Sequence, residues 1–127
     1  MEIRRGQVWW WSCPEHKREH IQAGTRPVVI VSNDVCNSVS TVVTVVPMTT
    51  RVKQPYPQEV PVVFNGGVSI VLADQLTSLP VSELTMCAGD LRDFQMEQVD
   101  KAIAVQLGFI EPTSKPYTPF TNKNEGE

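Results

Sequence analysis

The chain has 127 residues, which allows one hydrophobic core but not two independent ones. Apolar residues make up 41% of it and charged residues 20%, so the composition excludes a disordered or fibrous protein. With 11 Lys and Arg against 14 Asp and Glu, the formal net charge is -3. This charge argues against a protein that holds nucleic acid by bulk electrostatics, so any such binding depends on locally placed cations.

The three cysteines are an odd number without Cys-x-x-Cys spacing, which argues against a disulfide framework and a structural zinc site. The apolar runs are far shorter than the ~20 residues that a membrane-spanning helix needs. The N-terminal apolar run is too short for a signal peptide and lacks a cleavage site. We therefore expect a cytoplasmic protein with no membrane contact.

Short Val-rich runs, separated by Gly, Pro and Asn, predict a series of β-strands. The pairs Asn33-Asp34 and Asn37-Ser38 mark loops, and Asn65-Gly66 between two runs predicts a tight hairpin. In chain order the predicted strands are 7–13, 26–32, 41–47, 59–64, 69–73, 76–79 and a weakly marked 84–88, which ends at Gly89-Asp90.

One helix is predicted from Asp93 to Leu107, because apolar residues recur there at helical spacing, and Gly108 is a suitable C-terminal stop. The segment 111–127 loses this periodicity and is rich in Pro, Thr and Asn, so we expect a flexible tail. Many short strands plus one terminal helix predict a mainly β domain over residues 1–110, built as a small, strongly bent barrel with the helix packed on it.

The run Trp9-Trp10-Trp11 lies on the first predicted strand, where side chains alternate between faces. Trp10 should therefore point away from its two neighbours. Packing in the core or in a dimer is the favoured interpretation, and stacking on RNA bases is the alternative.

Arg26 stands at the mouth of an apolar strand, just after a Gly turn and just before Pro27. The proline biases Arg26 toward extended backbone, which holds the guanidinium on a rigid element. A planar fork of donors suits a phosphate group. The alternative is an ordinary strand-end charge in water.

Two hydroxyls and a cation, Thr49, Thr50 and Arg51, follow the buried run that ends at Pro47. Hydroxyls in that place can donate to phosphate oxygens. The alternative is turn chemistry, which is common for Thr pairs after Pro. Spacing along the chain does not reveal whether these residues approach Arg26.

Four sequence blocks follow one another along the chain: Gly6–Trp10, Gln22–Ser32, Val45–Thr50 and Ala73–Leu79. In this order they resemble the MazF/PemK family of toxins. The similarity extends from about Gly6 to Gly108 and implies a small SH3-like barrel of the MazF/PemK/CcdB type that forms a homodimer. It also implies a sequence-specific endoribonuclease, an mRNA interferase, that cuts single-stranded RNA without a metal or other cofactor and is neutralised by a cognate MazE-like antitoxin.

The resemblance assigns roles residue by residue. Arg26 matches the catalytic arginine that stabilises charge on the phosphorus centre, and Thr49 matches the catalytic threonine that holds the phosphate. Gln75 and, less closely, Asp74 match a step that lines the RNA groove. The remaining RNA-binding candidates are Ser32, Asn33, Thr50, Arg51 and Lys53.

Two positions depart from the family pattern. Ile21 stands where some relatives carry Glu, so a carboxylate base is missing. The adjacent His20 matches a histidine of PemK-like relatives and, with an ordinary pKa of about 6.5, is the candidate general base. The alternative is that His20 is a solvated loop residue. Leu72 stands where PemK-like relatives carry an arginine, whose role Arg51 or Lys53 would then take.

The implied reaction is attack of the RNA 2′-hydroxyl on phosphorus, which gives 2′,3′-cyclic phosphate and 5′-hydroxyl ends and needs no metal. A different class of function remains open, because the same barrel occurs in non-catalytic toxins that bind DNA gyrase. A zinc site formed by Cys13, His16 and His20 is a further, less favoured alternative.

Overall fold

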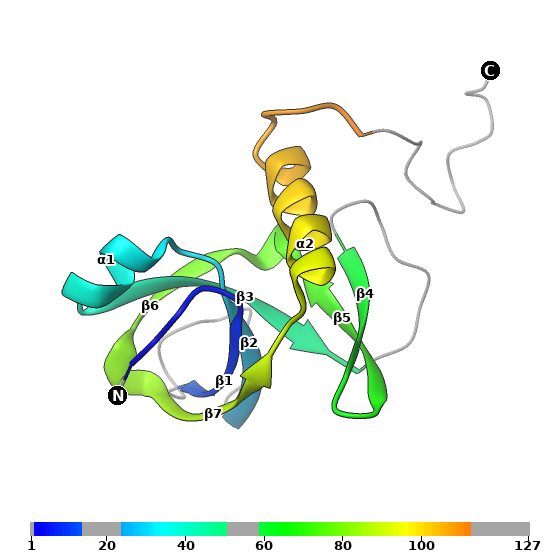
Figure 1. The fold of residues 1–127 in the computed structure, drawn as a ribbon. Helices are drawn as coiled ribbons and strands as arrows, with labels where there is room; N and C mark the ends of the chain where they lie inside the picture. The colour runs from blue at the N-terminus through cyan, green and yellow to red at the C-terminus, as the bar shows by residue number, and fades with distance from the viewer. Residues whose placement is uncertain (1, 14–23, 51–58, 113–127) are drawn as a thin grey trace, which may run out of the picture.

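The computed structural model describes residues 2–13, 24–50 and 59–112. Its elements form a curled antiparallel sheet with one long helix across it, as Figure 1 shows. In chain order they are β1 (Gln7–Cys13), β2 (Gly24–Ile30), α1 (Asp34–Val39), β3 (Val42–Thr49), β4 (Glu59–Phe64), β5 (Gly67–Leu72), the 3-10 turn η1 (Ala73–Gln75), β6 (Thr77–Pro80), the 3-10 turn η2 (Val81–Glu83), β7 (Leu84–Asp90) and α2 (Asp93–Gln106).

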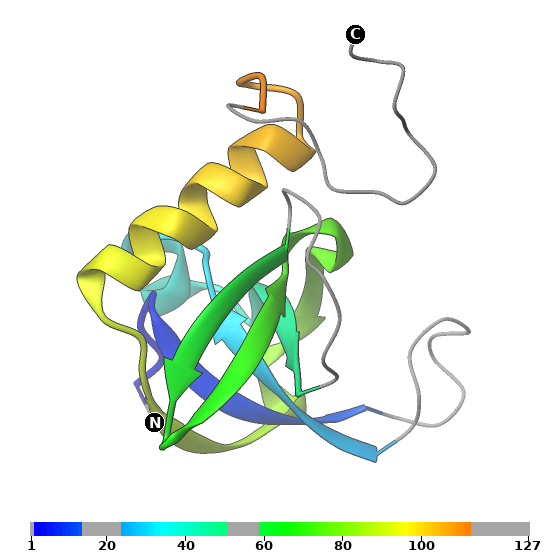
Figure 2. The same cartoon turned by 90° about the vertical axis from the view of Figure 1, so that its right-hand side faces the viewer.

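The sheet runs in the order β4-β5-β3-β2-β1-β7, with β6 paired to β3 off this path. The strand β3 is shared, because its first half pairs with β6 and its last two residues pair with β5. This change of partner bends the sheet, and the β4–β5 hairpin crosses in front of the other strands in Figure 2. The predicted fold class, a small mainly β barrel with a C-terminal helix, is confirmed.

Hydrophobic side chains pack on both faces of the central strands, which explains the nearly continuous Val runs. On one face Val8 and Val29 pack with Val99 of α2. On the other face Trp9 and Trp11 pack with Val28. Both of these tryptophans are buried and Trp10 is only half-buried, so the predicted alternation of the Trp run is confirmed.

The tight hairpin at Asn65-Gly66 is also confirmed. Asn65 has φ 52° and Gly66 has φ 82°, the pair of left-handed conformations that a two-residue hairpin turn prefers. The helix α2 ends as predicted at Gly108, whose φ is 82°. There the backbone N–H of Phe109 donates to Ala104 O at 2.8 Å and that of Gly108 to Val105 O at 3.1 Å, which closes the helix with a Schellman motif.

The structure differs from the prediction in several bounds, because β2 covers Gly24–Ile30 and not 26–32, β3 covers Val42–Thr49 and not 41–47, and β5 covers Gly67–Leu72 and not 69–73. The segment read as loops around Asn33 and Asn37 contains the helix α1, whose first turn Asn33 caps by accepting the backbone N–H of Cys36 at 2.9 Å. The strand predicted to end before Gly89 continues through Asp90, because β7 follows β1 as far as Gln7. The predicted tail begins near the end of the described residues and stays a prediction beyond residue 112. Within the described ranges, no helix is long and apolar enough to cross a membrane.

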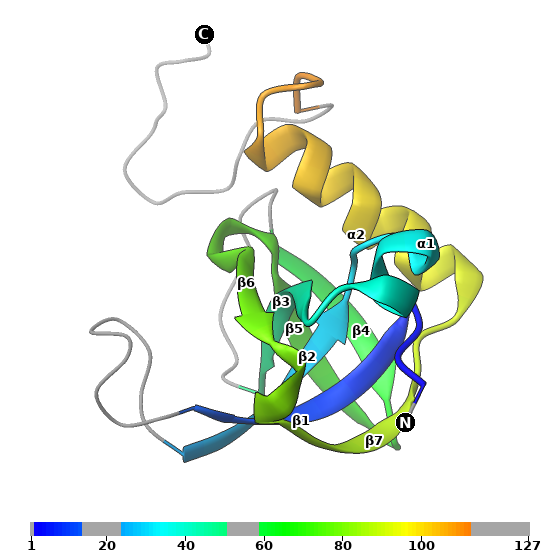
Figure 3. The same cartoon turned by 90° about the vertical axis from the view of Figure 1, so that its left-hand side faces the viewer.

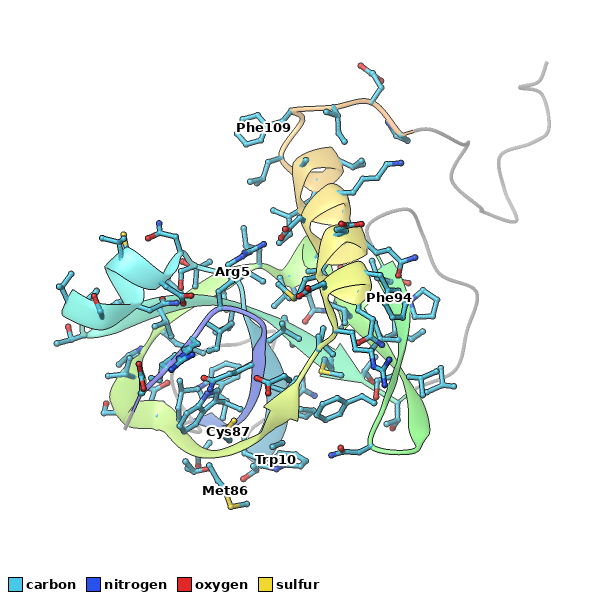
Figure 4. All side chains as sticks on the ribbon, viewed as in Figure 1. Arg5, Trp10, Met86, Cys87, Phe94 and Phe109 are labelled. Carbon is cyan, nitrogen blue, oxygen red and sulfur yellow. The ribbon has the colours of Figure 1, made fainter. Side chains whose placement is uncertain are left out.

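Arg5 ties the N-terminal segment to both helices, and Figure 4 shows it between them. Its backbone N–H donates to Asp34 Oδ1 at 2.7 Å, and its guanidinium donates to Val31 O and pairs with Asp100 of α2. The backbone N–H of Arg5, and then the Asn37 amide that donates to the same oxygen at 3.1 Å, lower the pKa of Asp34 from its ordinary value of 3.8.

A group whose pKa is lower in the folded state stabilises the fold above its unfolded pKa, and this stabilisation is lost as the pH falls through the folded value. We therefore expect Asp34→Asn to melt at a lower temperature than the wild type at neutral pH, with the difference shrinking as the pH falls below 3.8. Thermal melts of both proteins between neutral pH and strong acid test this. A difference that stays constant across that range would contradict the assignment.

Candidate functional site

Arg26 lies near the start of β2, directly opposite Trp11 of β1. Cross-strand partners share a face of the sheet, so Arg26 belongs to the same face as Trp11 and the core cluster that contains it. Arg26 is half-buried, and its guanidinium forms no ion pair or hydrogen bond with another of the described residues. It is a positive charge without an anionic partner from that part of the chain.

The register of β2 and β3 brings Thr49 to the same end of the sheet. Val28 pairs with Pro47, and extending this antiparallel register by two residues places Arg26 opposite Thr49. The two strands stop pairing before that point, and Met48 and Thr49 pair with β5 on the other edge of β3. Arg26 and Thr49 thus flank the place where β3 leaves β2. Thr49 is half-buried and Thr50, the next residue, is exposed.

Asp74 and Gln75 form the exposed part of η1, which joins β5 to β6. Both of these strands pair with β3, so η1 protrudes beside the middle of that strand, between the register pairs of Met48 with Val71 and of Val45 with Thr77. Asp74 and Gln75 therefore come directly after β5, the strand that pairs with Thr49. They lie on the far side of β3 from Arg26.

Ser32 and Asn33 lie beyond the opposite end of β2, about 20 Å from Arg26 if six residues are fully extended. The Ser32 hydroxyl donates to Asn37 Oδ1 at 2.6 Å and accepts the backbone N–H of Thr44 at 3.0 Å. Asn33 is the N-cap of α1. The Ser32 side chain thus links α1 to β3, and the structure does not bring Ser32 or Asn33 together with Arg26 and Thr49.

Three candidates, His20, Arg51 and Lys53, lie outside the described residues, and so does most of the Cys13, His16 and His20 string. Their roles remain predictions. The described segments contain no group of three or more His, Cys, Asp or Glu side chains that could hold a metal ion.

One contact near Arg26 was not predicted from the sequence. The indole Nε1–H of Trp11 donates to Glu83 Oε1 at 2.9 Å. These residues are 72 positions apart, and no local pattern connects them. The only signal in the sequence is that a buried tryptophan usually finds an acceptor for its N–H.

Comparison with known proteins identifies the family. Residues 4–107 match the family described as PemK-like, MazF-like toxin of type II toxin-antitoxin systems. The chain belongs to this family. The resemblance seen in the four sequence blocks is thereby confirmed, over nearly the same range.

Named relatives of this MazF-like toxin share its length and fold. Endoribonuclease MazF9 of Mycobacterium tuberculosis is 28% identical over 114 residues, which cover 83% of this chain and 96% of that protein. A mycobacterial endoribonuclease solved in complex with its cognate antitoxin is 27% identical with a TM-score of 0.71, over 87% of this chain and 99% of that one. MazF from Deinococcus radiodurans is 26% identical with a TM-score of 0.74, over 85% and 98% of the two chains.

Proposed function

We propose that this MazF-like toxin is a sequence-specific endoribonuclease that cleaves single-stranded RNA without a metal ion. The observation that carries the proposal is the half-buried Arg26, a cation without a described partner, at the same end of the sheet as Thr49. A fixed guanidinium in a partly desolvated place suits the charge that develops on a phosphate during cleavage. The mycobacterial and Deinococcus relatives, named endoribonuclease or MazF, support the same activity.

In the proposed reaction the RNA supplies its own nucleophile. A general base removes the proton of a 2′-hydroxyl, the oxygen attacks the adjacent phosphorus, and the bond to the 5′ oxygen of the next nucleotide breaks. The leaving 5′ oxygen takes up a proton from Arg26 or from water, and the products carry a 2′,3′-cyclic phosphate and a 5′-hydroxyl. Because nucleophile and phosphorus belong to one molecule, orientation supplies much of the acceleration. Arg26 and Thr49 stabilise the charge on the phosphate oxygens, and His20 is the proposed base.

The RNA strand would run from Arg26 and Thr49 toward η1, where Asp74 and Gln75 are exposed. We assign backbone contacts near the cleaved bond to Thr50, Arg51 and Lys53. Ser32 and Asn33, at the far end of β2, would meet only a nucleotide several positions away. A net charge of -3 means that these local contacts must supply the affinity.

We also propose that the toxin acts as a homodimer in the cytoplasm, that residues 1–110 carry the activity without the tail 111–127, and that a cognate antitoxin inhibits it. The mycobacterial relative was solved with such an antitoxin. An acidic segment that folds on binding would compete with RNA for Arg26 because both present negative charge to the same cation.

The test is to incubate the protein with a long mixed-sequence RNA in excess chelator and to sequence the ends. We expect cuts at one short motif with cyclic-phosphate ends. A DNA strand of the same sequence is the matched control and should stay intact, because it lacks the 2′-hydroxyl. Uncut RNA would contradict the proposal and favour a non-catalytic binding toxin. Cleavage that requires an added metal would contradict the mechanism.

A further inference from the structure

The hydrogen bond between Trp11 and Glu83 involves the cross-strand partner of Arg26. Trp11 is fully buried, and it pairs with Arg26 of β2 on one side and with Leu84 of β7 on the other. Figure 3 shows β1 between these two strands. Trp11 and Arg26 are therefore cross-strand neighbours on one face of the sheet.

A β-bulge in β7 brings Glu83 to the Trp11 indole. Trp10 pairs with Met86 and Trp11 with Leu84, so Thr85 is an extra residue in β7. Its hydroxyl donates to Trp10 O at 3.2 Å. Such a bulge bends a strand and redirects the chain beside it. Here the redirected chain is η2, whose last residue is Glu83. The carboxylate then accepts the indole N–H of Trp11 at 2.9 Å.

We infer that Trp11 and Glu83 are positioning residues for Arg26, which fix the plane of the indole and thereby the direction of the guanidinium. This inference rests on the proposed function and extends it to two residues that do not touch the RNA. A flat ring in a core can turn about its side-chain bonds unless a directional contact holds it, and the bond to Glu83 is such a contact. Arg26 has no hydrogen bond of its own within the described residues, and its cross-strand partner is Trp11, so in this inference contact with the ring sets the direction of the guanidinium.

A small shift of the catalytic cation should slow the chemical step more than it weakens RNA binding. Arg26 acts mainly on charge that appears in the transition state, so loss of its alignment lowers kcat and leaves KM nearly unchanged. A misplacement of about 1 Å can cost up to ~100-fold in rate. For a partial loss of the alignment of Arg26 we expect kcat to fall about tenfold.

The test compares Trp11→Phe, which removes the indole N–H, with Glu83→Leu and Glu83→Gln in the full chain, using the wild type's own RNA cleavage as the reference. Trp11→Phe and Glu83→Leu should each lower kcat about tenfold with KM within about twofold. Glu83→Gln retains a side-chain oxygen acceptor of the same length and should stay within about twofold of wild type in both constants. Thermal melts establish that each variant is folded at the assay temperature.

A double-mutant cycle with Arg26→Lys separates positioning from general destabilisation. Lysine keeps the charge but lacks the planar guanidinium, so a change in the orientation of the Trp11 ring should cause no further loss of rate. If Trp11 acts through Arg26, adding Trp11→Phe to Arg26→Lys should change single-turnover cleavage by less than about twofold. A second loss of about tenfold would overturn the inference, and so would Glu83→Leu at the wild-type rate. Should Trp11→Phe not fold, the same cycle is run with Glu83→Leu. Uncut RNA with the wild type would instead contradict the proposed function itself.

Discussion

Arg26→Ala is expected to lower RNA cleavage by about 1,000-fold or more while leaving the melting temperature close to that of the wild type. The rate falls because the fork of donors that faces the developing phosphate charge is lost. The melting temperature should fall only slightly, because the side chain loses some packing beside Trp11 but has no hydrogen bond or ion pair with another described residue to lose. Single-turnover cleavage of RNA containing the mapped site, together with thermal melts, measures both effects.

Arg4→Ala is the matched control, since it removes one positive charge from an exposed side chain whose ion pair is with Glu2. A surface pair of this kind contributes little, so this variant should cut at the wild-type rate. If Arg26→Ala and Thr49→Ala both retained wild-type cleavage, the proposed mechanism would be wrong. Equal losses in Arg4→Ala and Arg26→Ala would mean that total charge, rather than position, determines the rate.

Gly89→Ala is expected to destabilise the fold by about 2–4 kcal/mol. A Cβ at this position would lie 3.2 Å from Phe64 Cζ and 3.3 Å from Phe64 Cε1, closer than side chains usually approach. The residue also has φ 145°, a conformation that only glycine adopts easily. Phe64 belongs to β4 and Gly89 to β7, which are the two end strands of the sheet order. The added methyl group would therefore crowd the contact between these strands.

Chemical denaturation of Gly89→Ala and Gly67→Ala tests this. Gly67 lies in the same hairpin with open space around its added Cβ, so its variant should differ little from the wild type. Combining Gly89→Ala with Phe64→Leu should recover the part of the lost stability that comes from crowding against the Phe64 ring. The part that comes from the φ value of residue 89 should stay. If the two glycine variants proved equally stable, neither the contact nor the φ value would matter as argued.

The sequence predicted the elements where local signals agreed with the tertiary structure. The strands β1 and β4 have the predicted bounds, because each Val-rich or Trp-rich run is delimited by a Gly, Pro or Asn and is buried in the fold. The helix α1 was missed for a physical reason. Val35 and Val39 are 77% and 80% exposed, so its apolar residues do not report a buried face. Its stability comes from the Asn33 cap and the Asn37 hydrogen bonds.

The site depends on information that a single sequence does not contain. Arg26 and Thr49 could each be marked as a strand-end residue, but only the register of β2 and β3 places them at one end of the sheet. Ser32 shows the converse, because the family resemblance made it a candidate for the same groove and the extended strand β2 separates it from Arg26. The contact of Glu83 with Trp11 depends on a bulge in β7 that no sequence motif predicts.

The pairing of the last strand with the first has a consequence for synthesis of the protein in the cell. β1 lies between β2 and β7, so the sheet around Arg26 is incomplete until the ribosome has made residues 84–90 and released them from its exit tunnel. Glu83, which accepts the indole N–H of Trp11, is made just before the same stretch. A growing chain therefore lacks the finished sheet around Arg26 until this late stretch has emerged. We expect the proposed activity to arise only after residues 84–90 have left the ribosome and β7 has paired with β1.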